Sequence, residues 1–172
     1  MKSILAKGKY LHLINRDGWE YAHRPNTNGV VLIGALTPDN KLLLVEQYRV
    51  PVSSTVIELP AGLSGDIPGQ ENEELIRAAE RELVEETGYA AADLQLMLSG
   101  PISAGLCDET VNLFIARNLT RVGPGGGDDS ENIRVHEVPF DHIEDWLREQ
   151  AAQGRLLDPK IYTAIYFLRQ TH

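Results

Sequence analysis

The sequence predicts an α/β fold in which helices cover both faces of a mixed β-sheet, an α/β/α sandwich. Apolar runs of strand length and amphipathic segments of helix length follow one another without the strict alternation of a βαβ protein. The 172 residues suit one domain with a sizeable core. A hydrophobic content of 42% and a charged content of 24% are ordinary for a globular protein.

The N-terminal segment predicts two short strands, 3–14 and 19–23, on either side of a turn at 15–18. These strands form a short N-terminal β-hairpin. We therefore treat residues 1–25 as an extension and residues 26–172 as the main domain.

The middle of the chain predicts most of the sheet. Residues 29–36 are a continuous apolar run, which is typical of a strand covered on both faces. A turn at 37–40 then leads into residues 41–48, and this pattern predicts a hairpin. Further strands are expected at 94–99, 111–116 and 133–138.

Three segments predict helices. One begins near Glu71, and a second is expected to be capped by Asp141 and to stop at Gly154. The third opens at Asp158–Pro159 and runs to Gln170. Apolar side chains give this last helix one buried face, formed by Ile161, Ala164, Ile165 and Leu168.

Charge and cysteine content restrict the class of partner. The formal net charge of −9 argues against a nucleic-acid backbone or an anionic membrane as the main partner. The single cysteine, Cys107, excludes an internal disulfide and is typical of a reducing compartment. The N-terminus has no apolar stretch of signal-peptide length, and no segment is long enough to span a bilayer. We expect a cytoplasmic protein with no nucleic-acid and no membrane partner.

The run Arg-Glu-Leu-Val-Glu-Glu-Thr-Gly-Tyr at 81–89 concentrates carboxylates on one helical segment. The spacing puts Glu82, Glu85 and Glu86 on one face, where like charges destabilise a helix by about 0.2–0.5 kcal/mol per pair. A divalent cation offsets this repulsion, and Mg²⁺ prefers a few carboxylates, waters and phosphate oxygens. A solvated acidic helix face is the alternative, and the surrounding residues argue against it.

Those surrounding residues resemble the box of the Nudix hydrolases, G-x5-E-x7-R-E-U-x-E-E-x-G-U, in which U is apolar. The stretch from Glu73 to Tyr89 fits the second half of the box fully. The first half departs from it, because ten residues instead of five separate Gly62 from Glu73. The extra residues lie in a segment of turn-forming composition, so they lengthen a loop and leave the helix register intact.

Shorter segments resemble the ADP-ribose pyrophosphatase and nucleoside diphosphate sugar hydrolase branch of that family. They are 46–49, 58–62, 100–109, 129–135 and 157–162. The resemblance implies the Nudix-type α/β/α sandwich and hydrolysis of ADP-ribose or a related nucleotide sugar. The products would be a nucleoside monophosphate and a sugar phosphate. It also implies Mg²⁺ as the cofactor, with Mn²⁺ as an alternative, because divalent cations stabilise the charge that develops on the phosphoryl oxygens.

The same resemblance assigns roles to residues. The implied metal ligands are the Ala61 backbone carbonyl, Glu82, Glu85, Glu86 and Glu131. The implied catalytic residues are Arg81, Glu85, Asp129 and Glu131. Arg81 is expected to orient the glutamates through ion pairs, and Glu73 to fix Arg81 or the loop. A plain helix salt bridge explains these two residues equally well.

The attacking water needs a base within hydrogen-bond reach, and in this branch an acidic loop supplies it. The glycine-rich residues 123–130 predict a mobile loop without regular structure. Asp129 aligns best with the base and Glu131 with a further metal ligand, while the adjacent Asp128 stays open as an alternative. A Gly/Asp linker without chemistry is the other interpretation.

The implied substrate-binding residues are Trp19, Arg49, Glu58 and Glu109. Arg49 would clamp the diphosphate, because a guanidinium binds phosphate oxygens in a planar, bidentate way. Trp19 or Tyr21 would stack on the base, although aromatic residues more often belong to a core. Glu109 would accept a hydrogen bond from a ribose hydroxyl.

The resemblance further implies a homodimer, because members of this branch exchange N-terminal strands and share residues across the interface. Three alternative functions stay open. They are a hydrolase that prefers GDP-mannose, a Nudix sensor that binds a nucleotide sugar without cleaving it, and a hydrolase of an oxidised nucleoside triphosphate or an RNA cap.

Overall fold

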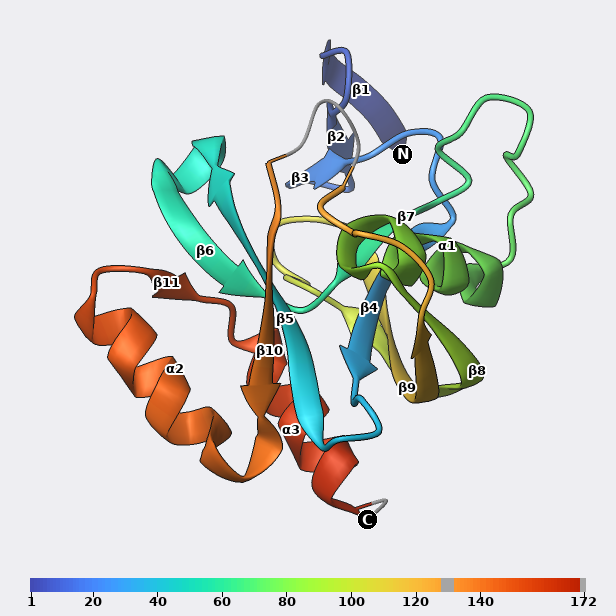
Figure 1. Cartoon of the computed structure of the whole chain (residues 1–172). Helices are drawn as coiled ribbons and strands as arrows, with labels where there is room; N and C mark the ends of the chain where they lie inside the picture. The colour runs from blue at the N-terminus through green and yellow to red at the C-terminus, as the bar shows by residue number, and fades with distance from the viewer. Residues whose placement is uncertain (128–131, 171–172) are drawn as a thin grey trace.

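The computed structural model of the chain describes residues 1–127 and 132–170, which form two four-stranded sheets, a small N-terminal sheet and three α-helices (Figure 1). The predicted α/β/α sandwich is confirmed. One helix covers one face of the main sheets, and two helices cover the other. In the part of the chain that is described, no helix has the length and apolar character needed to cross a membrane.

The N-terminal sheet consists of β1 (Lys2–Lys7), β2 (His12–Arg16) and β3 (Trp19–His23), all antiparallel. The strand predicted at 3–14 is therefore two strands. The chain turns between them, and the Gly8 amide donates a 2.7 Å hydrogen bond to the Leu11 carbonyl. The predicted turn at 15–18 is confirmed, since Arg16 pairs with Trp19 across it. Figure 1 shows this sheet standing beside the main body of the molecule.

The two main sheets divide the predicted strands between them. The first has the order β7 (Ala61–Ser64), β4 (Gly29–Ala35), β9 (Thr110–Arg121) and β8 (Tyr89–Pro101). The second has the order β10 (Arg134–Pro139), β5 (Lys41–Arg49), β6 (Ser54–Glu58) and β11 (Leu156–Leu157). Strands β6 and β7, which sequence reasoning did not identify, lie on either side of Pro60. A short 3-10 helix, η1 (Val50–Val52), joins β5 to β6.

The predicted hairpin between 29–36 and 41–48 is wrong. The turn itself exists, and the Asn40 amide donates a 3.0 Å hydrogen bond to the Thr37 carbonyl. Only the bridge between Leu36 and Leu42 joins the two strands, however, and each then continues into a different sheet. The reason is burial. Both strands are apolar on both faces, so each is covered on two sides by different neighbours.

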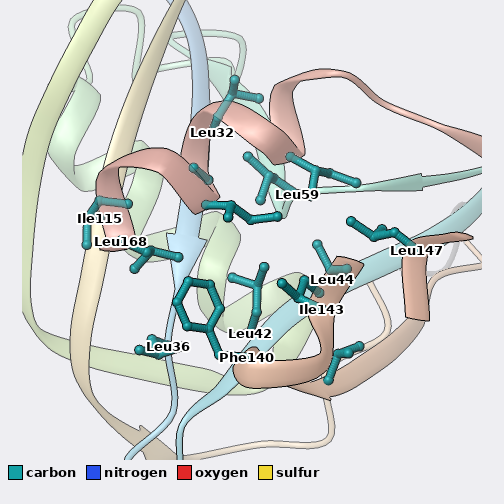
Figure 2. Close-up of a cluster of buried hydrophobic side chains, with 14 of the residues drawn as sticks. Leu32, Leu36, Leu42, Leu44, Leu59, Ile115, Phe140, Ile143, Leu147 and Leu168 are labelled. Carbon is teal, nitrogen blue, oxygen red and sulfur yellow. The ribbon is translucent and has the colours of Figure 1, made fainter. Parts of the chain in front are cut away.

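Alternate residues of β4 belong to two different cores. Val31 and Ile33 pack with the helix α1 (Leu75–Thr87), whereas Leu32 packs with α2 (Ile143–Ala152) and α3 (Lys160–Gln170). Figure 2 shows the larger core, in which side chains of β4, β5 and β9 meet those of α2 and α3. The labelled members are Leu32, Leu36, Leu42, Leu44, Leu59, Ile115, Phe140, Ile143, Leu147 and Leu168.

The three helices lie where the sequence predicts them, and the differences are at their N-termini. Helix α1 begins four residues after Glu71, because residues 67–73 form turns, with the Glu73 amide bound to the Gln70 carbonyl at 2.9 Å. Asp141 caps no helix, since it lies inside a 3-10 turn, η2 (Phe140–His142), that precedes α2. Asp158 does begin α3, because its Oδ1 accepts a 2.9 Å hydrogen bond from the Lys160 amide. The four residues predicted for the apolar face of α3 are all buried.

Candidate active site

Strand β7 and helix α1 meet at Gly62, where no side chain fits. A Cβ at this position would lie 1.9 Å from Cδ and Oε1 of Glu82. The glycine therefore allows the backbone of β7 to lie directly against the Glu82 carboxylate. This contact brings the first and second halves of the Nudix-like motif together, and the longer loop between them does not prevent it.

Arg81 holds the carboxylates of the motif in place. Its Nη1 donates to Oε1 of Glu82 at 2.7 Å and to Oε2 of Glu85 at 3.2 Å, while Nε donates to Oε1 of Glu73 at 3.1 Å. Nη2 donates to the Leu63 carbonyl at 3.0 Å and to Glu73 at 3.2 Å. Burial opposes the charge of Arg81, but Glu73 and Glu82 outweigh it and hold the pKa of the guanidinium above its ordinary value. These contacts favour the orienting role over a direct catalytic one.

Glu86 is the most buried acid of the segment, with 3% of its surface exposed. Its Oε2 accepts a 2.9 Å hydrogen bond from the Ala61 amide, so β7 fixes this side chain as well. Glu82 lies beside it, and burial raises the pKa of Glu82 to about 7 against the opposing charge of Arg81. The charges of Glu85 and Asp66 raise this pKa further. Such a shift is typical of carboxylates crowded together in a cleft.

Glu82 and Glu86 open into a cavity of about 520 Å³ between the two main sheets. Of the predicted site residues, the cavity is lined by Arg49, Ala61, Glu82, Glu86 and Glu109. Glu58 contributes through Arg49, because its Oε2 accepts a 2.7 Å hydrogen bond from Nε of Arg49. Residues from β5, β7, α1 and the loop before β9 thus converge on one site.

Two predicted residues lie apart from this cavity. Half of the Glu85 side chain is exposed, and it reaches the site only through its ion pair with Arg81. Trp19 is 69% exposed on β3 and lines a neighbouring pocket of about 340 Å³ together with Tyr21 and Cys107. Its predicted contact with the base stays a prediction.

Three cavity residues with polar side chains were not identified from the sequence: Arg24, Gln47 and Asp66. Gln47 had a usable signal, because it lies two residues before Arg49 on β5 and so shares its face. Asp66 lies in the loop 63–72, which is five residues longer than in the box. Arg24 belongs to no motif, and only the fold brings it to the cavity.

The glycine-rich segment lies against the C-terminal end of α1. The Gly126 amide donates to the Glu86 carbonyl at 2.8 Å, and the Gly127 amide donates to the Glu85 carbonyl at 3.0 Å. Its described part, residues 123–127, forms no helix or strand and is hydrogen-bonded to the helix that carries the acids. Asp129 and Glu131, together with the alternative Asp128, lie outside the described residues.

The site fits a hard divalent cation. Glu82 and Glu86 offer carboxylate oxygens to one cavity, and Mg²⁺ is commonly bound by one or two carboxylates together with waters and substrate phosphates. Within residues 1–127 and 132–170, no cluster of three or more His, Cys, Asp or Glu side chains has the geometry to hold a metal ion.

The sandwich and the cavity lined by Glu82 and Glu86 agree with the Nudix-type arrangement that the motif implies. The model of the NUDIX domain matches residues 25–161. The chain is 34% identical over 142 residues to the ADP-ribose pyrophosphatase of Bacillus subtilis strain 168, which covers 82% of this chain and 72% of that protein. The chain belongs to the Nudix hydrolase family.

Other relatives carry different names. The methanol dehydrogenase activator of Bacillus methanolicus is 32% identical over 142 residues, with 82% of this chain and 72% of that protein covered. The GDP-mannose pyrophosphatase of Escherichia coli K12 is 28% identical over 172 residues, with 93% of this chain and 85% of that protein covered. A crystal structure of an ADP compounds hydrolase matches 99% of this chain and 90% of its own, with a TM-score of 0.73. At 23% identity, that match shows a shared fold.

Proposed function

We propose that this enzyme hydrolyses the diphosphate linkage of ADP-ribose or a related nucleoside diphosphate sugar, giving a nucleoside monophosphate and a sugar phosphate. The observation that carries the proposal is the cavity in which Glu82 and Glu86 face Arg49. Carboxylates suit a cation, a guanidinium suits phosphate oxygens, and a nucleotide sugar diphosphate requires both. Relatives named ADP-ribose pyrophosphatase and GDP-mannose pyrophosphatase support this class of substrate.

The charges of the cavity support a requirement for a metal ion. Arg24 and Arg49 face four carboxylates, which are Asp66, Glu82, Glu86 and Glu109. An excess of negative charge would repel a diphosphate unless cations bind first. We propose Mg²⁺, or alternatively Mn²⁺, bound by Glu82 and Glu86, with the Ala61 carbonyl and Glu131 as further ligands. Bound there, the cation would neutralise charge that develops on the phosphoryl oxygens.

The residues around the acids have separate tasks. Arg81 keeps Glu82 and Glu85 oriented, and the Ala61 amide keeps Glu86 oriented. Arg49, steadied by Glu58, binds phosphate oxygens and holds the diphosphate in position for attack by water. We propose that Asp129 is the base that accepts a proton from that water, with Asp128 and Glu131 as alternatives.

We propose that the protein is a homodimer and that residues 1–25 form the interface. Trp19 of this segment would stack on the nucleobase of the substrate. Large apolar side chains on this sheet and its first turn are exposed, among them Ile4, Leu5, Leu11 and Leu13. Exposed apolar side chains grouped in this way mark interaction surfaces. A cytoplasmic location follows from the proposed substrate and the single cysteine.

The function is tested by incubating the enzyme with ADP-ribose, GDP-mannose, UDP-glucose and a nucleoside triphosphate, each with and without Mg²⁺. Release of monophosphate is followed. We expect metal-dependent cleavage of at least one nucleotide sugar, and the same experiment ranks the base and the sugar. Tight binding without cleavage would instead identify a sensor. Cleavage of the triphosphate alone would refute the proposed substrate class.

A further inference from the structure

The loop that joins β7 to α1 brings one charged side chain, Asp66, to the main cavity. The loop covers residues 65–74 (Figure 1), and it accounts for the ten residues, instead of the five of the Nudix box, that separate Gly62 from Glu73. The box specifies no residue type between these two positions. Asp66 is therefore a feature of this sequence and has no role that the box assigns.

The loop is fixed directly beside Asp66. The Gly65 amide donates to Oε2 of Glu73 at 3.3 Å, and Nδ2 of Asn28 donates to the Glu71 carbonyl at 2.9 Å. Gly65 has a φ of +79°, and a Cβ there would lie 2.6 Å from Nδ2 of Asn28. The backbone before Asp66 is thus held against the domain, so the fold determines where its side chain meets the cavity.

Asp66 differs from the other acids of the cavity in its partners. The other three each accept a hydrogen bond from a protein group: Glu82, Glu86 and Glu109. Among the described residues, no hydrogen bond or ion pair involves the side chain of Asp66, which is exposed. A carboxylate has two oxygens that only accept hydrogen bonds. Asp66 therefore presents acceptors to the donor groups that a ligand brings into the cavity.

The chemistry of the proposed ligand limits which donors Asp66 meets. Phosphate oxygens carry the same sign of charge as a carboxylate and repel it. A metal ion shared with Glu82 and Glu86 is disfavoured, because no three acids within residues 1–127 and 132–170 have the geometry to hold one. Asp66 is not among the described residues that line the pocket of Trp19, where we place the base. The hydroxyl groups of the sugar are the donors that remain.

We propose that Asp66 is a specificity-determining residue that accepts hydrogen bonds from hydroxyl groups of the sugar. In a nucleotide sugar, the diphosphate lies between the base and the sugar. With the diphosphate between Arg49 and the acids of α1, and the base toward Trp19, the sugar lies toward Asp66. Two neighbouring hydroxyls suit the two carboxylate oxygens, whereas a further phosphate in that place is repelled. This inference rests on the proposed function, because it takes a nucleotide sugar as the ligand.

The test uses the full-length protein with Mg²⁺ and two probes. They are the nucleotide sugar that the wild-type enzyme cleaves and the nucleoside diphosphate of the same base, which lacks the sugar. Asp66→Ala should raise KM for the nucleotide sugar by about tenfold, the lower end of the usual range for a hydrogen bond to a charged group, because the side chain is exposed. The inhibition constant of the nucleoside diphosphate should not rise. Glu74→Ala removes an exposed carboxylate at the start of α1, outside the cavity, and as the matched control should change neither value.

Two further measurements separate the sugar from the metal ion and from the fold. Asp66→Asn keeps the size of the side chain and one acceptor oxygen, so its KM should lie between those of the wild type and Asp66→Ala. In both variants, the Mg²⁺ concentration that gives half of the maximal rate and the melting temperature should stay close to the wild-type values. A higher Mg²⁺ requirement with a normal KM, or an equal loss of affinity for both probes, would overturn the sugar-binding role.

The outcomes distinguish this inference from the proposed function. A wild-type enzyme that cleaves a nucleotide sugar while Asp66→Ala keeps a normal KM would refute the role of Asp66 alone. A wild-type enzyme that cleaves no nucleotide sugar would refute the proposed function. In that case, calorimetry with the same two probes decides about Asp66. A preference of the wild type for the nucleotide sugar that Asp66→Ala lacks would still support its role, and equal affinities of the wild type for both probes would refute it.

Discussion

Gly125 lies so close to Glu86 that a Cβ on the glycine would be 2.8 Å from the Glu86 carbonyl oxygen. The same Cβ would be 2.4 Å from the carbonyl carbon of Thr87, and the backbone of Gly125 has a φ of +70°. Gly88 shows the reciprocal contact, because its Cβ would meet the Gly123 carbonyl oxygen at 2.3 Å. Gly88 and Gly125 therefore allow the loop after β9 to pack directly on the end of the helix that carries the acids.

We expect Gly125→Ala to lower turnover by about tenfold or more, because the added methyl group must displace the loop from Glu86 and forces a left-handed conformation on alanine, at a cost of about 1–3 kcal/mol. Gly123→Ala is the matched control, since a Cβ there has no neighbour within 4 Å. Steady-state kinetics and thermal unfolding of both variants check the expectation. Equal activities would show that the close packing has no role in catalysis.

Glu86→Gln should fold but lose at least about two orders of magnitude in turnover, as is usual when a charge that stabilises the transition state is removed. The amide can still accept the hydrogen bond from Ala61, so the structure around it is retained. Glu80→Gln, on the same helix but paired with Arg77 at the surface, provides the control. A near wild-type rate of the Glu86→Gln enzyme would show that Glu86 has no role in catalysis.

Arg81→Lys should reduce both activity and stability, because a lysine ammonium cannot replace a fork that contacts three carboxylates and the Leu63 carbonyl. We expect a loss of about 1–3 kcal/mol in the free energy of unfolding and a weaker response to Mg²⁺. Denaturant unfolding and a Mg²⁺ titration of activity measure the two effects. Arg77→Lys is the control, and an unaltered Mg²⁺ response in Arg81→Lys would contradict the orienting role.

Glu46 gives the fold a dependence on pH. Burial raises the pKa of this carboxyl, but the hydrogen bonds from His136 at 2.7 Å and Arg155 at 3.1 Å outweigh it, so the pKa is lowered overall. A folded-state pKa below the unfolded value stabilises the protein above the unfolded pKa, near 4.3. This contribution is lost as the pH falls through the folded value.

We therefore expect Glu46→Gln to be less stable than the wild type at pH 6 and 7, with the difference shrinking progressively below about pH 4.3. Urea unfolding across this pH range measures it. Glu149→Gln, on the exposed surface of α2, serves as the control. A difference that stays constant from pH 7 to pH 3 would show that the charge of Glu46 does not contribute.

The proposed dimer predicts that Leu5→Asp shifts the protein toward the monomer, because a carboxylate would then be buried in an apolar interface. Leu156→Asp is a matched control, since Leu156 on β11 is exposed to a similar degree, 46% against 50% for Leu5. Light scattering at micromolar concentration gives the mass of each variant. A wild-type protein with a monomeric mass would refute the dimer.

Local patterns account for the parts of the site that the sequence predicted. Glu82 and Glu86 lie on one helix, and a spacing of four residues places them together whatever surrounds them. The apolar face of α3 could be predicted for the same reason. Contacts between segments that are distant in the sequence could not be predicted in this way. The ion pair of Arg24 and Glu109 depends on how β3 meets the loop before β9, and nothing near either residue indicates the other.

The hairpin between β4 and β5 was wrongly predicted for the same reason, because strand pairing depends on distant contacts. The turn at Thr37–Asn40 is a local feature and was predicted correctly, but the partners of β4 and β5 are determined by the cores that cover them. A turn between two apolar strands predicts a hairpin, but strands covered on both faces can equally belong to two different sheets. Asp141 was misassigned because a 3-10 turn comes between it and the α-helix.

The divergence of β4 and β5 has a consequence for substrate size. The strands touch at Leu36 and Leu42 and then separate, so that Val30 and Arg49 line the cavity at the other end. The distance along each strand between the two ends is about 20 Å at the rise of a β-strand. Between the two ends, Leu32 of β4 and Leu44 of β5 belong to the same apolar core. We therefore expect substitutions in this core to change the width of the cavity, and with it the size of the ligand that fits, without altering Glu82, Glu86 or Arg49.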